Sequence, residues 1–160
     1  MLERIAELLK KNKLWVATAE SCTAGLIAHT LTNISGSSEY YKGGIVAYSN
    51  EIKVKILGVK EETLKKYGAV SEQTAREMAE GTRKVIGVDV AIATTGIAGP
   101  TGGTKEKPVG LVYIALATPE ATEVKRFIFK GDRLENKQNF CNAAVGMLLD
   151  YLEKMDKNQK

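Results

Sequence analysis

The sequence predicts an α/β protein, a three-layer α/β/α sandwich whose mixed, mostly parallel sheet contains one antiparallel strand. Helix-like and strand-like segments alternate along most of the chain. Strands joined through helices pair in parallel, because the connection must cross the sheet between them. Near the C-terminus two strands are separated only by residues 118–122, which is too short for a crossover and predicts an antiparallel hairpin.

The N-terminal half contains three predicted helices and two predicted strands. Leu2, Ile5, Leu8 and Leu9 have helical spacing and predict a first helix that runs to about Lys11. The following segment is apolar enough for a short buried strand, which ends at the polar sequence Glu20-Ser21-Cys22-Thr23. The predicted elements are a strand over 14–19, a helix over 23–32, a turn over 35–38, a strand over 44–48 and a helix over 52–57.

The C-terminal half contains the strand with the clearest signal. Residues 88–94 are continuously small or β-branched apart from one aspartate, which is typical of a buried parallel strand. Ser71 is a suitable N-cap for the helix that precedes it. The predicted elements are helices over 60–67, 71–86 and 134–154, strands over 88–94, 109–117 and 123–129, and a glycine-rich loop over 96–108.

Length and composition indicate a single cytoplasmic domain spanning residues 1–160. The net charge of +4 is spread along the chain, and 6% aromatic residues provide no stacking platform, so no nucleic-acid partner is expected. No apolar run approaches the ~18 residues that a membrane span needs. One histidine, two distant cysteines and no CxxC pair predict neither a metal site nor a disulfide.

A ligand site is expected at one edge of the sheet. In α/β folds, ligands bind where the carboxyl ends of strands lead into loops and helices. Three segments rich in Ser, Thr, Gly and Tyr are predicted to meet there, namely residues 20–25, 48–53 and 94–103.

Ser21 is a candidate nucleophile at this edge, and the alternative interpretation is that Ser21 or Thr23 simply caps a helix. His29 lies about two turns into the same predicted helix and is poorly placed to act as its base. Lys53 is the leading base, although a solvated helix lysine is the alternative. Cys22 is a rival nucleophile or a small core residue.

The segment TTGIAGPTGGT (94–104) follows the buried strand and suits close backbone contact with a phosphate or a ribose. It matches no standard nucleotide fingerprint, and a flexible loop is the alternative. Lys107 and Arg133 are the nearest basic residues in flanking loops. Arg133 can bind a phosphate through two hydrogen bonds, or it can form an ion pair with Asp132 or another carboxylate.

Several motifs together resemble the CinA C-terminal domain family, which includes nicotinamide-nucleotide amidases. The resemblance runs from about Ala17 to the final helix. It rests on ATAESCTAG (17–25), YYKGGIVAYSNEIKVKILGV (40–59), GAVSEQTAREMAEG (68–81), TTGIAGPTGGTKEKPVGLVYIAL (94–116) and FKGDRLENK (129–137). It implies an α/β/α fold, a homo-oligomer and the conversion of nicotinamide mononucleotide to nicotinate mononucleotide and ammonia, without a metal or other cofactor.

The resemblance also implies roles for individual residues. Ser21 corresponds to the family nucleophile and Lys53 to the lysine that activates it, with Tyr48 beside them in the catalytic group. The expected substrate-binding residues are Cys22, Thr23, Gly25, Thr95, Gly96, Gly99 and Arg133, with backbone N–H groups of 22–25 holding the oxyanion.

Two positions depart from the family pattern. Ala24 replaces a glycine of the ESCTGG-type motif, and Lys137 stands where an arginine is frequent. A methyl group at position 24 is expected to narrow the approach to the oxyanion site, and Lys137 to weaken phosphate contact. The alternative function is therefore a non-catalytic nucleotide-binding or regulatory module that retains the pocket.

Overall fold

The computed structural model describes residues 1–159, which form a five-stranded sheet in the order β2-β1-β3-β4-β5. The strands are β1 (Val16–Glu20), β2 (Tyr41–Val46), β3 (Val90–Gly96), β4 (Leu111–Ala117) and β5 (Thr122–Ile128). β1 pairs in parallel with β2 and β3, whereas β4 pairs antiparallel with both β3 and β5. β4 is thus the one reversed strand, which confirms the predicted mixed sheet.

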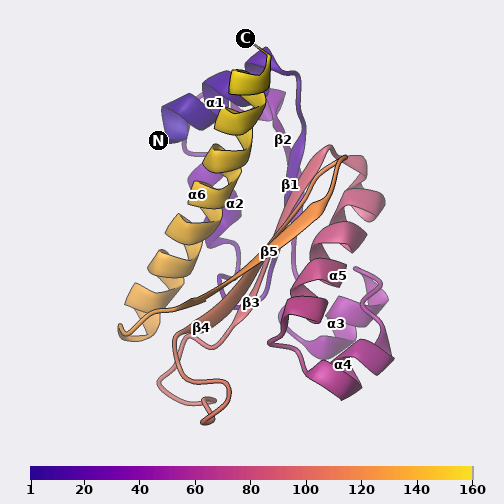
Figure 1. Ribbon diagram of the computed structural model, residues 1–160, viewed down its shortest axis with the longest axis vertical. Helices are drawn as coiled ribbons and strands as arrows, with labels where there is room; N and C mark the ends of the chain where they lie inside the picture. Colours follow the sequence, from indigo (N-terminus) through magenta and orange to yellow (C-terminus); the bar gives the residue numbers. More distant parts are fainter. Residues whose placement is uncertain (160) are drawn as a thin grey trace.

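Helices cover both faces of the sheet, as the sandwich prediction requires (Figure 1). One layer contains α1 (Leu2–Lys11), α2 (Leu26–Leu31) and α6 (Arg133–Asn158), and the other contains α3 (Asn50–Lys55), α4 (Glu61–Tyr67) and α5 (Glu72–Thr82). A 3-10 turn at Ser37–Glu39 and a π-helical turn at Arg83–Gly87 follow α2 and α5. Within residues 1–159, no helix combines the length and hydrophobicity needed to cross a bilayer.

Side-chain size differs between the two faces of the sheet. Alternate residues of a strand point to opposite faces, so β3 and β4 present different side chains to each layer. The face toward α1, α2 and α6 carries large residues, including Ile92, Val112, Ile114 and Leu116. The opposite face carries small side chains, which pack against α5. The residues of this cluster are Ala19, Ala93, Ala115 and Ala117 of the sheet with Ala75, Met78 and Ala79 of α5. α5 can therefore approach the sheet closely.

The ends of several elements differ from the predicted ends. Ser71 caps α5 as expected, since its hydroxyl accepts a hydrogen bond from the Thr74 N–H. β2 begins at Tyr41, before the predicted position 44, and α6 is longer at both ends. Asp132 sets the start of α6 through a reciprocal capping box with Glu135, a local signal that hydrophobic periodicity does not contain.

α2 begins at Leu26 and not at Thr23, which corrects the prediction of a helix over 23–32. Ala24 and Gly25 have left-handed backbone conformations, with φ of 48° and 100°, and such conformations interrupt a right-handed helix. Residues 21–25 therefore form a tight turn between β1 and α2. This turn determines where each of their side chains points.

Candidate functional site

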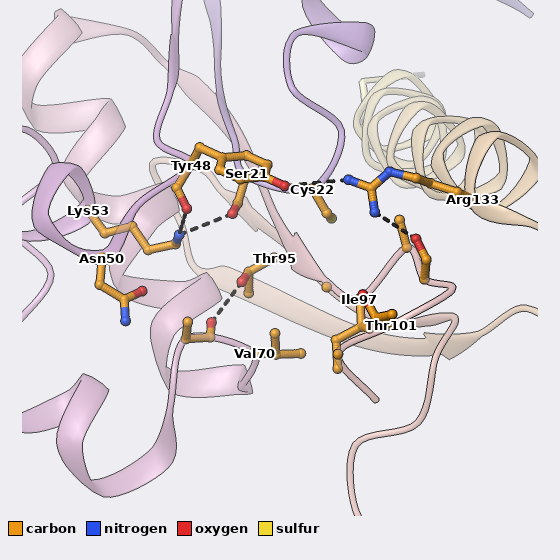
Figure 2. A pocket seen from close by; sticks show the side chains of 15 residues that line it. Ser21, Cys22, Tyr48, Asn50, Lys53, Val70, Thr95, Ile97, Thr101 and Arg133 are labelled. Atoms are coloured by element: carbon orange, nitrogen blue, oxygen red, sulfur yellow. Dashed lines mark hydrogen bonds between the residues drawn. The ribbon is translucent and has the colours of Figure 1, made fainter. Parts of the chain in front are cut away.

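A cavity of about 330 Å3 opens at the carboxyl ends of the parallel strands (Figure 2). Its lining includes Ser21 and Cys22 after β1, residues of the segment after β2 (Tyr48, Asn50 and Lys53), and residues from the end of β3 and the loop that follows it (Thr95, Gly96, Ile97, Ala98, Gly99, Thr101 and Gly102). Arg133, the first residue of α6, lies on the opposite side from Lys53. The three segments predicted to meet at one edge of the sheet do meet there.

The centre of the cavity wall is a contact between a serine and a lysine. The Lys53 Nζ atom lies 3.1 Å from Ser21 Oγ and donates a 2.9 Å hydrogen bond to the backbone carbonyl of Tyr48. Ser21 is 8% exposed and Lys53 only 1%. A hydroxyl and an amine held within hydrogen-bond distance have the geometry required of a nucleophile and its base.

Lys53 lies on the buried face of the short helix α3. Ser49 caps α3 by accepting a hydrogen bond from the Ile52 N–H, which fixes the start of the helix. Lys53 then extends along its inner face toward Ser21 (Figure 2). Burial lowers the pKa of its ammonium group, and no carboxylate in residues 1–159 forms an ion pair with it. The interpretation of Lys53 as a solvated helix lysine is therefore wrong.

Glu20 holds the turn behind Ser21. Its carboxylate is buried and accepts hydrogen bonds from Thr23 Oγ1 at 2.7 Å and from the N–H groups of Ile27 and Ala28 at 2.8 and 3.0 Å. The first free N–H groups of α2 are thus occupied by Glu20. Neither Ser21 nor Thr23 caps this helix in the predicted way, and the Ser21 hydroxyl is directed to Lys53 instead.

Cys22 lines the same cavity but has the character of a core residue. Its side chain packs in the cluster beneath α2 and α6, and burial raises the pKa of its thiol to about 12. A reactive thiolate needs a lowered pKa, so this environment disfavours Cys22 as the nucleophile.

Thr23 and Gly25, both predicted to bind substrate, do not line the cavity. Thr23 points back into the protein, where its hydroxyl contacts Glu20 and lies 2.9 Å from Thr94 Oγ1. Gly25 lies with Ala24 and Lys137 along a separate surface depression beside His29. Two consequences follow: the Ala24 methyl group does not obstruct the cavity, and Lys137 is not part of its wall.

The glycine-rich segment forms the wall nearest Arg133. Arg133 donates a 2.6 Å hydrogen bond to the carbonyl of Gly99, and its second terminal nitrogen lies 3.5 Å from the Tyr48 hydroxyl. Within residues 1–159 it forms no ion pair with Asp132 or any other carboxylate. The guanidinium group is exposed at the cavity rim with most of its donors available.

Two further predicted residues occupy the floor of the cavity. Thr95 is 1% exposed and donates a 2.7 Å hydrogen bond to the carbonyl of Ala69, which ties β3 to the segment before α5. Gly96 lines the cavity where β4 passes close by, and a Cβ there would lie 2.5 Å from the Leu111 carbonyl oxygen. Glycine at this position is thus required by the approach of β4.

Sequence reasoning missed Asn50, Val70 and Thr101, which also line the cavity. Asn50 precedes Lys53 by three residues on α3, and this spacing places both on one helix face, so the signal was available. Thr101 lies within the segment 94–103 that is predicted at this edge, although it was not singled out. Val70 comes from the connection between α4 and α5, whose path no local pattern reveals, and its position depends on tertiary packing, including the hydrogen bond from Thr95 to Ala69.

Comparison with known proteins places this architecture in a family. The family model described as the CinA C-terminal domain matches residues 1–152. The chain belongs to the CinA C-terminal domain family. A CinA-like protein from Chloroherpeton thalassium is 56% identical over 154 residues, which cover 94% of this chain and 37% of that protein. This CinA-family chain thus spans about 37% of the length of that curated relative.

Solved structures of CinA proteins have the same fold. A CinA superfamily protein from Klebsiella pneumoniae is similar with a TM-score of 0.92 and 35% identity over 96% of both chains. The competence/damage inducible protein CihA from Agrobacterium tumefaciens has a TM-score of 0.85 and 42% identity over 95% of both chains. The three-layer sandwich is therefore the fold of the CinA family.

Proposed function

We propose that this CinA domain is an amidohydrolase that converts nicotinamide mononucleotide to nicotinate mononucleotide and ammonia. The observation that carries the proposal is the buried Lys53 amine, 3.1 Å from the Ser21 hydroxyl in the wall of an open cavity. Burial favours the neutral amine, and a neutral amine can accept the proton of an attacking hydroxyl.

Catalysis begins with attack of Ser21 Oγ on the carboxamide carbon while Lys53 Nζ takes the hydroxyl proton. The Tyr48 carbonyl accepts a hydrogen bond from the same nitrogen and orients it. The backbone N–H of Cys22, which donates to no backbone carbonyl in residues 1–159, is the candidate donor to the oxyanion. Lys53 then returns the proton to the departing ammonia, and water hydrolyses the acyl-serine.

In this proposal, the wall opposite Lys53 binds the phosphate of the nucleotide. Arg133 lies across the cavity from Lys53, with its guanidinium oriented by Gly99 (Figure 2). An arginine held in this way can form paired hydrogen bonds with a phosphate. Binding at a distance from the reacting carbon positions the carboxamide against Ser21. Gly96, Gly99 and Thr95 shape the space between the two ends.

The alternative of a non-catalytic nucleotide-binding module rested on Ala24. Its methyl group lies outside the cavity, on an exposed turn, so it offers no physical reason for lost chemistry. The buried Ser21–Lys53 contact favours the amidase.

The test measures ammonia release from nicotinamide mononucleotide. We expect turnover in the unmodified protein and in Lys55→Ala, a matched control that removes an exposed lysine of the same helix. Ser21→Ala should abolish it, Lys53→Ala should reduce it by a factor of about 100 or more, and Cys22→Ala should retain it. Turnover that survives Ser21→Ala would reject the serine nucleophile. Absence of turnover in the unmodified protein, despite binding of the nucleotide, would favour the non-catalytic module.

A further inference from the structure

A second cavity, of about 400 Å3, lies beside the first but faces a different part of the sheet. Its lining includes Val124 and Arg126 of β5 and Tyr113 of β4, all on the face toward α5. Further residues come from the start of α5 and the segment before it, including Tyr67 and Val70, and Lys107 from the glycine-rich loop. None of these residues takes part in the proposed amidase chemistry, although Val70 lines both cavities.

Two cations face this second cavity without a carboxylate partner. Arg126 forms no ion pair within residues 1–159, and Lys107 donates a 2.6 Å hydrogen bond to the Tyr67 carbonyl. That bond fixes the position of the ammonium group and leaves its other N–H donors available. Glu72 is the one carboxylate of the lining, and it lies 3.4 Å from Arg76 of the next helical turn. The cavity therefore has an unneutralised positive charge.

Aromatic and apolar groups stand next to these cations. Tyr113 and Arg126 are directly opposite each other in the β4–β5 ladder, so their side chains share one face of the sheet at close range. Tyr67 is 39% exposed at the rim, and Val70 and Val124 add apolar surface. Guanidinium groups bind phosphates through paired hydrogen bonds, and tyrosine rings pack against flat heterocycles. The volume lies within the range of small-ligand sites.

We propose that this second cavity is a binding site for a mononucleotide, with Arg126 and Lys107 holding its phosphate and Tyr67 and Tyr113 contacting its base. The site is distinct from the Ser21 cavity, because a different basic pair lines it and its wall comes from β4 and β5, whereas the Ser21 cavity lies at the carboxyl ends of the parallel strands. The two cavities share Val70, and the glycine-rich segment lines the first cavity at Thr101 and the second at Lys107. A ligand in the second cavity therefore contacts Val70 and the glycine-rich loop, both of which also border the first cavity.

The test is a titration with adenosine monophosphate followed by backbone amide NMR, with adenosine and inorganic phosphate as separate arms. We expect the largest shifts at Tyr67, Lys107, Tyr113 and Arg126, and tighter binding of the monophosphate than of either part alone. Arg126→Ala should weaken binding about tenfold or more, because it removes hydrogen bonds between charged groups. The exposed Arg126 side chain can be removed without disturbing the core.

Lys125→Ala is the matched control, since Lys125 is the adjacent residue of β5 and points to the opposite face. It makes the same change in net charge and should leave binding unaltered. Equal weakening by both variants would overturn the proposal, because it would indicate only a general charge effect. So would shifts confined to Ser21, Lys53, Gly99 and Arg133, or phosphate binding as tight as that of the nucleotide. None of these measurements depends on amidase activity.

Discussion

At Lys53, burial and local hydrogen bonding act on the same ammonium group. The side chain is enclosed, it faces the Ser21 hydroxyl and the Tyr48 carbonyl, and no negative charge in residues 1–159 pairs with it. Withdrawal from water disfavours the charged form, which lowers the pKa. A hydroxyl beside a neutral amine is a far better nucleophile than the same hydroxyl in water.

This environment predicts a pH dependence of the proposed amidase reaction. In the proposed mechanism the neutral amine of Lys53 is the active form, so kcat/KM should rise as pH increases through the lowered pKa of Lys53 and then level off below the ordinary range of a lysine. The measurement is kcat/KM for nicotinamide mononucleotide from acidic to alkaline pH. A profile that falls as Lys53 loses its proton would contradict the role of a general base.

Substitution of Lys53 tests the same role through the rate. Lys53→Ala should lower kcat by a factor of about 10²–10⁴ or more, the usual contribution of a general base, with little change in KM. Steady-state kinetics of this variant and of Lys55→Ala give the comparison. An unchanged kcat would remove Lys53 from the mechanism.

Ala24 carries strain that its replacement should relieve. Its φ of 48° lies in the left-handed region, which costs an alanine roughly 1–2 kcal/mol relative to glycine, whereas the greater freedom of glycine in the unfolded chain offsets about 0.4–1 kcal/mol. Ala24→Gly should therefore raise the free energy of unfolding by about 0.5–1 kcal/mol. Urea denaturation measures this change, and kcat should not respond, since Ala24 lies outside the cavity. A loss of stability would show that the turn is not strained.

At the scale of elements, the join between β1 and α2 depends on Glu20. One carboxylate oxygen accepts from Thr23 Oγ1 and the Ile27 N–H, and the other accepts from the Ala28 N–H. The strand end, the turn and the helix start thus share one buried acceptor. Because Ser21 is the next residue along the chain, the same contacts hold its backbone in place.

Glu20→Gln should destabilise the fold by about 1–3 kcal/mol, because the new amide nitrogen cannot accept the hydrogen bond that one carboxylate oxygen receives. The denaturant midpoint reports the loss. Thr30→Ala is a suitable comparison, since its hydroxyl contacts the Leu26 carbonyl within α2 and does not support the turn. If both variants lower the denaturant midpoint equally, Glu20 supports only the start of α2 and not the turn.

Predictability from sequence followed the range of the interactions. β3 and the hairpin of β4 and β5 were predictable because burial and a short connection are local signals. The position of Ser21 and Lys53 at one sheet edge was predictable because both residues follow strands, and their catalytic roles stay a prediction. The direction of the Thr23 side chain could not be predicted from the sequence pattern, because the left-handed turn at Ala24 directs this side chain toward Glu20. Val70 reaches the cavity only through tertiary packing.

At the scale of the whole molecule, hydrogen bonds and ion pairs join the first helix, α1, to the end of the last helix, α6. Asp156 near the end of α6 is 3% exposed and accepts hydrogen bonds from Lys11 at 2.7 Å and from Arg4 at 3.3 Å. Gln159 donates a further bond to the side chain of Asn12. These contacts join α1 to α6 at the edge of the large hydrophobic core.

Asp156→Asn should lower the free energy of unfolding by about 1–2 kcal/mol, because an amide nitrogen replaces one buried acceptor facing cationic donors. Thermal or urea denaturation measures it, with the exposed Asp150→Asn of the same helix as the control. The proposed amidase activity of the folded protein should be unaffected. A midpoint unchanged from that of the control would show that packing alone holds α1 on α6.

The length of α6 also separates these contacts between α1 and α6 from the cavity. Its first residue, Arg133, borders the cavity, and its 26 residues, at a rise of about 1.5 Å each, extend over roughly 39 Å toward Asp156 and the end of α1. Figure 1 shows the start of α1 and the end of α6 toward that remote end. A fluorophore, an affinity tag or a surface tether attached at Met1 or beyond the end of α6 therefore leaves the cavity open, so immobilised protein should catalyse the proposed reaction as the free protein does.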